Sequence, residues 1–296
     1  MLVIGAVFVD VKGFAREKYM PEGRNVGDVQ VTAGGVCRNV AEDLAKLGKA
    51  PRFVSMVDDS ALGREVRDGL AALGVGVEHV ISAEKGMGMW LAILDENGDL
   101  AGSISRQPDF SALEAYLSER GDEIMAGADG VALEFDMNAA ISARVLALAK
   151  KHGKPIYSIV GNMGVILQHP EYLHDVTCFI CNELEASRLF RQELAGAAPE
   201  AMLEALRRGS AVAGIPAMVI TMGPQGSVYV DNRTGEFGYC PPQEVEVVDT
   251  TGAGDAFFSA AVAALMDGAP LSQAVQEGTR LAARTLQVAG SCAENG

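Results

Sequence analysis

Asp249-Thr250-Thr251-Gly252-Ala253-Gly254-Asp255-Ala256-Phe257 is the most informative run in the chain. It follows an extended, β-branched segment at 244–248 and opens an apolar segment at 256–266, which predicts the order strand, small-residue turn, helix. The start of a helix leaves backbone N–H groups unpaired and carries a partial positive charge, so it can hold an anion. Gly252 and Gly254 permit a tight turn and a close approach to the backbone. The run therefore predicts an anion site at a helix N-terminus.

Asp255 falls in the first turn of that helix, beside the predicted anion site. A carboxylate there would repel a bound phosphate, but it has a purpose if a hydroxyl must lose a proton while a phosphoryl group arrives. The alternative is a helix start in which the dipole favours Asp255 and the glycines only form the turn. A lone Gly-x-Gly-Asp would favour that alternative, whereas the full nine-residue run is far more specific.

The nine-residue run closely resembles the C-terminal signature of the ribokinase-like (PfkB) family of sugar and nucleoside kinases. The resemblance implies a catalytic base at Asp255 and an anion hole formed by the N–H groups of Gly252, Ala253 and Gly254. It also implies ATP and Mg²⁺ as co-substrate and cofactor.

A second run, Ala33-Gly34-Gly35-Val36-Cys37-Arg38-Asn39-Val40-Ala41, resembles the N-terminal signature of the same family. A Gly34-Gly35 pair permits close backbone approach, and Asn39 offers a donor and an acceptor to a polyol. The alternative is an N-cap at Asn39 with two turn glycines. Asp10, expected at the end of the first strand, matches the family position whose carboxylate binds sugar hydroxyls; such an Asp is otherwise an ordinary turn former.

Three further segments resemble the family's nucleotide and cation sites. Asn182-Glu183-Leu184-Glu185 is similar to the N-x-x-E motif, in which the glutamate acts through water on the Mg²⁺–phosphate group, although a helix-capping pattern also explains it. Thr221-Met222-Gly223-Pro224-Gln225-Gly226 is similar to the turn that lines the phosphates and ribose, with a plain strand-turn-strand as the alternative. Asp249 and Thr251, with main-chain oxygens near 289–291, resemble a monovalent-cation loop, which implies K⁺.

The run from Asn25 to Ala45, together with Val9-Asp10-Val11-Lys12-Gly13, looks most like the pseudouridine kinase branch. Two departures from the branch stand out; the first affects the surroundings of the phosphate, and the second leaves the specificity for the base open. The run Tyr157-Ser158-Ile159-Val160-Gly161-Asn162 lacks the Asp usual at that strand end. Met87-Gly88-Met89-Trp90 stands where a Thr or Ser is expected before a hairpin.

Composition limits the possible partners. The 296 residues are 49% hydrophobic and 21% charged, and the net charge of −15 argues against a nucleic-acid polymer or an anionic membrane surface. No apolar run is long enough to span a membrane, and the N-terminus reads as a buried strand rather than a signal peptide, which predicts a cytoplasmic protein. Cys178 and Cys181 form a CxxC, but a strand places them on opposite faces, so we expect buried thiols.

The pattern of elements predicts a doubly wound, three-layer, mostly parallel sheet within a single domain. The Asn97-Gly98 turn between extended runs indicates a hairpin. With strands near 6–14 and 28–33, this hairpin forms a small separate sheet, a lid made of about 8–33 and 86–106 inserted in the α/β core. The regular part is predicted to comprise helices 39–47, 59–73, 111–126, 138–152, 183–194 and 199–213, strands 51–57, 129–135, 155–160, 176–181 and 216–222, and a hairpin of 227–231 and 236–239.

Together these features predict an ATP-dependent kinase acting on a primary hydroxyl, with pseudouridine the favoured acceptor and a homodimer formed through the lid. Another PfkB sugar kinase (ribose, fructose or 2-keto-3-deoxygluconate type) is the nearest alternative. A non-catalytic, ligand-sensing relative would have lost Asp255 or its glycines. A dinucleotide-dependent oxidoreductase would need a G-x-G-x-x-G after the first strand, which is absent.

Overall fold

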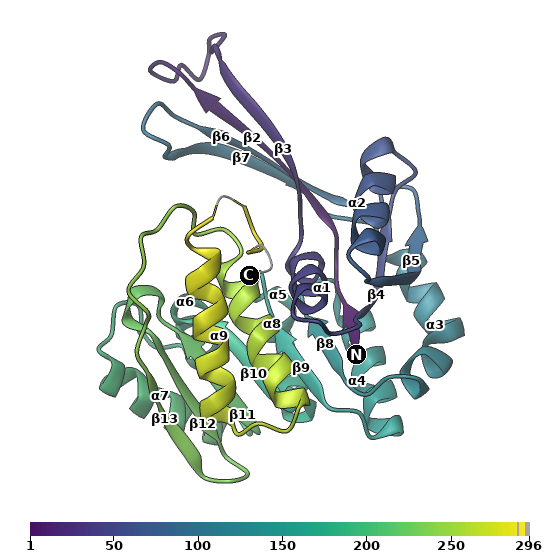
Figure 1. Ribbon diagram of the computed structural model, residues 1–296, viewed down its shortest axis with the longest axis vertical. Coiled ribbons are helices and arrows are strands. Elements are labelled where there is room, and N and C mark those ends of the chain that lie inside the picture. Colours follow the sequence, from purple (N-terminus) through teal and green to yellow (C-terminus); the bar gives the residue numbers. More distant parts are fainter. Residues whose placement is uncertain (289, 294–296) are drawn as a thin grey trace.

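The computed structural model describes residues 1–288 and 290–293, which contain one large and one small β-sheet (Figure 1). The large sheet is parallel from β11 to β5, and β12 and β13 extend it as an antiparallel edge. Its strands, in spatial order, are β13 (Glu236–Cys240), β12 (Ser227–Asp231), β11 (Ala217–Thr221), β10 (Cys178–Asn182), β9 (Ile156–Ile159), β8 (Val131–Glu134), β1 (Leu2–Ile4), β4 (Arg52–Val57) and β5 (Gly76–Ser82). The predicted mostly parallel sheet is confirmed.

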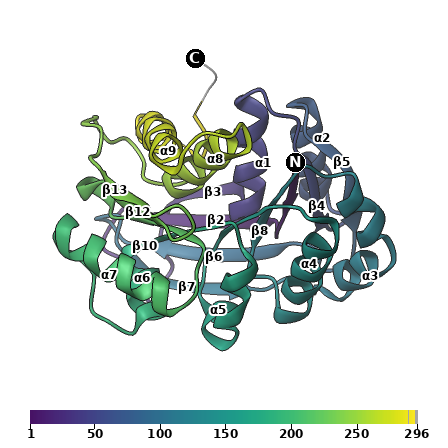
Figure 2. The ribbon, with the colours of Figure 1, turned by 90° about the horizontal axis from the view of Figure 1, so that it is seen from below.

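Helices cover both faces of this sheet, which gives three layers (Figure 2). One layer comprises α1 (Val36–Lys46), α2 (Ala61–Ala72), α8 (Ala253–Met266) and α9 (Leu271–Thr285). The other comprises α3 (Ser111–Ala126), α4 (Ala139–His152), α5 (Gly164–Gln168), η1 (Pro170–Asp175), α6 (Glu183–Phe190) and α7 (Pro199–Val212). Strand residues alternate between the two cores: Leu2 and Ile4 pack on the α3–α7 side, and Val3 packs on the α1–α8 side. None of the described helices is long and apolar enough to cross a bilayer.

The cysteine pair on β10 follows the same alternation. Cys178 packs into the core beneath α1 and α8, whereas Cys181 packs into the opposite core, and both thiols are buried. The expected buried thiols on opposite faces are therefore confirmed.

The small sheet has the order β3 (Gly27–Gly34), β2 (Phe8–Ala15), β6 (Gly88–Leu94), β7 (Leu100–Arg106), and it extends away from the α/β body (Figure 1). Residues in register across a sheet share one face. One face carries the apolar row Val31, Val11, Leu91, Ile104, and the opposite face carries the row Thr32, Asp10, Trp90, Ser105. The predicted small sheet is thus confirmed, with its two faces different in chemistry.

Two expectations about elements are wrong, and one helix was not predicted. Asp10 does not end the first strand: that strand is split into β1 in the large sheet and β2 in the small one, and Asp10 lies within β2. Residues 244–248 form no strand, although they are β-branched, because they pair with no neighbouring strand and Val248 N–H donates instead to the Leu286 carbonyl. Helix α9 was not expected at all.

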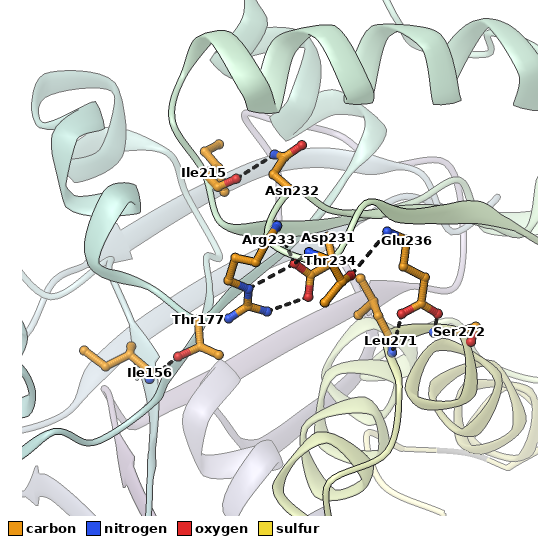
Figure 3. A network of polar contacts seen from close by, with 10 residues as sticks. All are labelled: Ile156, Thr177, Ile215, Asp231, Asn232, Arg233, Thr234, Glu236, Leu271 and Ser272. Carbon is orange, nitrogen blue, oxygen red and sulfur yellow. Dashed lines mark hydrogen bonds and ion pairs between the residues drawn. The ribbon is translucent and has the colours of Figure 1, made fainter.

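A polar network anchors α9 to the edge of the large sheet (Figure 3). Pro270, the residue before α9, provides no side-chain cap. Glu236 of β13 accepts hydrogen bonds from the N–H groups of Leu271 (3.3 Å) and Ser272 (2.9 Å), so a carboxylate from another element caps the helix. In the adjoining turn, Asp231 accepts from Arg233 Nε at 3.0 Å and Nη2 at 2.7 Å. The two hydrogen bonds to Glu236 hold the N-terminus of α9, whose far end lines a cavity described below.

Candidate active site

The N-terminus of α8 is built from glycines that the surrounding chain requires. Gly252 is the N-cap residue, with φ 78°, and a side chain there would overlap the carbonyl oxygen of Ser291. Gly254 differs, because nothing lies within 4 Å of the position its Cβ would occupy. No side chain caps the helix, and the Ala253 N–H makes only a long 3.4 Å bond to the Thr250 carbonyl. The end of α8 therefore presents N–H groups to an open space.

Asp255 lies in the first turn of α8 and is partly buried. Its Oδ2 accepts a hydrogen bond of 2.6 Å from Asn39 Nδ2 on α1. Burial raises the pKa of Asp255 to about 7, although the Asn39 hydrogen bond acts in the opposite direction. Asn39 is not the N-cap of α1; Gly35 holds that position, so the capping alternative for Asn39 is wrong.

Two cavities meet at this helix start. The first, of about 280 Å³, is lined by Asp10, Gly35, Asn39 and Asp255 among others. The second, of about 630 Å³, is lined by both Ala253 and Gly254. Consecutive residues 254 and 255 thus face different cavities. We call them the acceptor cavity and the donor cavity, after the roles that the sequence predicts for their residues.

The acceptor cavity combines polar and aromatic walls. Asp10 contributes a carboxylate whose pKa burial raises, and a side chain on Gly34 would come within 2.8 Å of its Oδ2. Gly34 therefore has to lack a side chain for Asp10 to take this position. Phe8 and Phe110 line the same cavity. The wall can bind a polyol at one side and an apolar ring at the other.

Glu134 and Asp136 also line the acceptor cavity, and the sequence reasoning missed them. Glu134 is the last residue of β8 and Asp136 follows it, so both lie at the carboxyl end of that strand. Two acidic residues at a parallel strand end were the available signal. Burial is the main cause of the raised pKa of both carboxyls, and the Asp136 charge raises the pKa of Glu134 further. Glu134 Oε2 accepts from Ala6 N–H at 3.1 Å, which ties the cavity wall to the end of β1.

Asp136 supplies a carboxylate at the end of β9, where the sequence lacks the expected Asp. The end of β9 has no Asp of its own, but Asp136 Oδ2 accepts from the backbone N–H groups of Gly161 and of Asn162, the latter at 2.6 Å. Its other oxygen, Oδ1, is buried and has no hydrogen-bond partner among the residues that the structure describes. A buried acceptor without a donor is costly, so this oxygen is suited to a donor from a bound molecule.

The donor cavity contains the predicted nucleotide turn. Thr221, Gly223 and Gly226 line it, with Gly223 opening the short helix η2 (Gly223–Gln225). Its apolar wall is formed partly by Val245 and Val247 and partly by the end of α9. The role of these valines in the wall explains why the 244–248 segment is β-branched without being a strand. Ser227 Oγ, on another lining residue, is buried without a partner.

Asn182 and Glu185 do not line either cavity. They form a capping box at the start of α6, in which Glu185 Oε2 accepts from Asn182 N–H at 2.8 Å, so the capping interpretation is confirmed. Glu185 nevertheless lies close enough to affect both aspartates. Burial is the main cause of the raised pKa values of Asp136 and Asp255, and the negative charge of Glu185 raises them further. Its role toward Mg²⁺ and nucleotide stays a prediction.

The predicted cation loop is closed by backbone contacts. Asp249 Oδ1 accepts from Thr251 N–H at 2.9 Å, and Asp249 Oδ2 accepts from Gly290 N–H at 3.3 Å. Residue 289, also expected in this loop, lies outside the described residues. Cation binding by Asp249 and Thr251 stays a prediction.

Comparison with known proteins places this geometry in context. The model of the pfkB family carbohydrate kinases matches residues 1–295. Guanosine-inosine kinase of Exiguobacterium acetylicum is 38% identical over 285 residues, covering 96% of this chain and 93% of that protein. Pseudouridine kinase of Escherichia coli (strain K12) is 28% identical over 278 residues, covering 93% and 87%. The structure of Arabidopsis thaliana ribokinase complexed with ribose and ATP superimposes with a TM-score of 0.85 at 24% identity, covering 99% of this chain and 95% of that one, and confirms the ribokinase-like fold.

Proposed function

Because the chain belongs to the pfkB family of carbohydrate kinases, and so is a phosphotransferase acting on a sugar or nucleoside hydroxyl, we propose that it phosphorylates the primary hydroxyl of a nucleoside with ATP. The observation that carries this proposal is the meeting of the two cavities at residues 254 and 255. A phosphoryl group held by the N-terminus of α8 and a hydroxyl held in the acceptor cavity would face each other across Asp255.

Asp255 would act as the base. It lies beside the anion site, and its raised pKa suits proton removal near neutral pH. The acceptor hydroxyl would donate its proton to Asp255 as its oxygen bonds to the γ-phosphorus and the bond to ADP breaks. The N–H groups of Gly252, Ala253 and Gly254 would stabilise the negative charge on the transferring phosphoryl oxygens. The small sheet, through Asp10, would act as a lid that holds the acceptor and excludes water.

The family implies ATP and a divalent metal. The charge of Glu185 raises the pKa values of Asp136 and Asp255, which places Glu185 near the meeting point of the two cavities. Among the described residues no three acidic, histidine or cysteine side chains are grouped closely enough to hold a metal ion, so phosphate oxygens and water would supply most of its ligands. When bound, Mg²⁺ would neutralise charge on the phosphate oxygens. Glu185 is the residue we expect to hold it through water. For K⁺ we propose Asp249 and Thr251, beside the same helix start.

A 6-oxopurine nucleoside, inosine or guanosine, is the acceptor we favour, ahead of pseudouridine. The support is the higher identity to guanosine-inosine kinase, 38% against 28% for pseudouridine kinase. The aromatic wall formed by Phe8 and Phe110 suits a nucleobase better than a free sugar. The unpaired Asp136 Oδ1 requires a donor, which a base N–H or a ribose hydroxyl provides.

An ADP-release screen tests the proposal. Purified protein with Mg²⁺ and K⁺ is given ATP and, separately, inosine, guanosine, pseudouridine, ribose, fructose and 2-keto-3-deoxygluconate. We expect turnover with inosine and guanosine, and mass spectrometry of the product should show one added phosphoryl group. Activity on a free sugar alone would keep the class and refute the nucleoside assignment. Absence of turnover with every acceptor would favour the ligand-sensing alternative.

We also propose that two copies pair through the small sheet. The apolar row on its outer face includes Val31, Leu91 and Ile104, which are 54%, 38% and 71% exposed. Both edges, β3 and β7, have no further strand paired to them in the described part of the chain. An exposed apolar sheet face with free edges is stabilised by a partner.

A further inference from the structure

The amide of Asn39 is held from both ends. Its Nδ2 donates to Asp255 Oδ2 at 2.6 Å, and its Oδ1 accepts from Arg38 Nη1 at 2.6 Å and from Ser291 Oγ at 3.1 Å. Rotating the amide by 180° would place its oxygen against the Asp255 carboxylate and its NH₂ group against the Arg38 donor. Both pairs would then be mismatched. The orientation of the amide therefore depends on the donors at its oxygen end.

Arg38 is the better placed of these two donors. It belongs to the same helix as Asn39, and its guanidinium carries a permanent charge, so it cannot become an acceptor. The second donor, Ser291, has a hydroxyl that can rotate and can accept as well as donate. Arg38 Nη1 also reaches the Ser291 oxygen at 3.5 Å, so the arginine orients both neighbours.

We infer that Arg38 is a positioning residue for the phosphoryl transfer: its guanidinium fixes the Asn39 amide so that this amide holds the Asp255 carboxylate ready to accept the proton of the acceptor hydroxyl. This inference rests on the proposed function. It assigns no contact between Arg38 and either substrate.

Arg38 is itself fixed along the outer side of α1. Its Nη2 forms an ion pair with Glu42, one helical turn further on, and Glu42 Oε1 also binds Lys46 Nζ at 2.8 Å. The Arg38 and Glu42 side chains are each only 13% exposed, so this pair is shielded from solvent. The guanidinium is held at Nη1 by Asn39 and at Nη2 by Glu42, so it has little freedom to move. A positioning residue requires such restraint.

The charge of Arg38 also acts on Asp255 through space. Negative groups surround Asp255 on several elements: Asp43 on α1, Glu134 on β8 and Glu185 on α6. Burial raises the pKa of Asp255, while the Asn39 hydrogen bond and the Arg38 charge lower it. Removing the Arg38 cation should therefore raise the pKa of the base, so that a smaller fraction of it is ionised at neutral pH.

The test compares Arg38→Met and Arg38→Lys with Arg120→Met, a control that removes an equally charged side chain paired with Glu123 on the distant helix α3. For Arg38→Met we expect kcat to fall roughly 100-fold with KM for ATP little changed. The acid limb of the kcat profile should move up by about one pH unit. Arg38→Lys should return the acid limb toward wild type but recover kcat only in part, because an ammonium lacks the planar fork. Arg120→Met should match the wild type.

A fall in kcat with an unmoved acid limb would reduce Arg38 to a structural role, and an Arg38→Met enzyme within twofold of wild type would refute the inference outright. A titration that needs no acceptor tests the effect of Arg38 on Asp255 separately from the proposed function. The carboxyl carbon of Asp255 is followed by NMR in ¹³C-aspartate-labelled protein and assigned with Asp255→Asn. Its pKa should be higher in Arg38→Met than in wild type. If wild type turns over no acceptor, the proposed function fails, and this titration still shows whether Arg38 acts on the Asp255 carboxylate.

Discussion

Two carboxylates near the start of α8, one partly and one fully buried, have similarly raised pKa values and different surroundings. Asp255 and Asp43 are each raised to about 7, mainly by burial. Asp255 borders a cavity, whereas Asp43 is 2% exposed and accepts a 3.4 Å hydrogen bond from Ser259 Oγ between α1 and α8. The first can exchange a proton with a substrate. The second can only affect stability.

Asp255→Asn should lower kcat by roughly 10³-fold, because the amide cannot take the hydroxyl proton, while ATP binding is retained. Steady-state ADP release and ATP titration measure the two effects. Asp267→Asn, at the other end of the same helix, removes an exposed carboxylate that pairs with Lys49 and should keep wild-type turnover. An Asp255→Asn enzyme with most of its activity would show that another group is the base.

The pH dependence of kcat/KM for the acceptor should show an acid limb centred near pH 7. The base must be ionised to accept a proton, and burial raises the pKa of Asp255 to about 7, so activity should fall as the pH drops below that value. Rates measured from pH 5 to 9 at saturating ATP test this. A limb centred near pH 4 would mean that Asp255 titrates like an exposed carboxyl.

Asp43→Asn should stabilise the protein at high pH and much less at low pH. The folded pKa of about 7 exceeds the ordinary 3.8, so the native state binds the extra proton, and stability is lost as the pH rises through 7. The upper limit of this loss is roughly 4 kcal/mol. We expect the difference in Tm between mutant and wild type to be more positive at pH 8 than at pH 5. An equal difference at both pH values would refute the assignment, and the exposed Asp68→Asn on α2 serves as the control.

At the level of elements, the two glycines that begin α8 have separable purposes. Gly252→Ala should lower Tm markedly, because φ is 78° and the methyl group would overlap the Ser291 carbonyl. Gly254→Ala should keep the wild-type Tm, because its surroundings are open, but should lower kcat/KM for ATP because the methyl group enters the donor cavity. Calorimetry and kinetics on both variants separate the effects. Equal loss of Tm in the two would refute this division.

The sequence predicted those elements whose signal is local. The turn at 252–254, the alternation that separates Cys178 from Cys181 and the Asn-Gly hairpin each depend on a few neighbouring residues, and each is confirmed. The segment 244–248 was predicted as a strand because β-branched residues suit strands, but its valines line a cavity formed by distant elements. Tertiary context decides such cases.

The site was predictable where a motif carried it and not where the fold assembled it. The sequence signatures predict Asp255, Asn39 and Gly254 as site residues. Asp136, by contrast, follows strand β8 and accepts hydrogen bonds from Gly161 and Asn162, which follow strand β9. The contact of Arg38 with Ser291 joins residues 253 positions apart in the chain. Only the folded chain shows such neighbours.

For the whole molecule, the two faces of the small sheet predict how copies associate. Val31→Lys, alone or with Ile104→Lys, should convert a dimer into a monomer, because buried charge at a pairing face is unfavourable. Light scattering coupled to size exclusion measures the mass. Gln30→Lys, exposed on the opposite face of the same strand, should leave the dimer intact. A wild-type protein with the mass of one chain would refute the pairing.

Because the first strand is split into β1 and β2, the small sheet is attached to the core through a short buried segment about which it could tilt like a lever. Only residues 5–7 separate β1 from β2, and all three are buried, with Gly5 bonded to Val54 and Ala6 to Glu134. From Phe8 to Ala15 the strand reaches outward by roughly 25 Å. A tilt of about 10° at the pivot would therefore swing the tip by roughly 4 Å while moving Asp10, near the pivot, by about 1 Å. If the acceptor binds at Asp10 as proposed, a small shift there would become a large displacement at the far end of the sheet, where the proposed second copy would make contact.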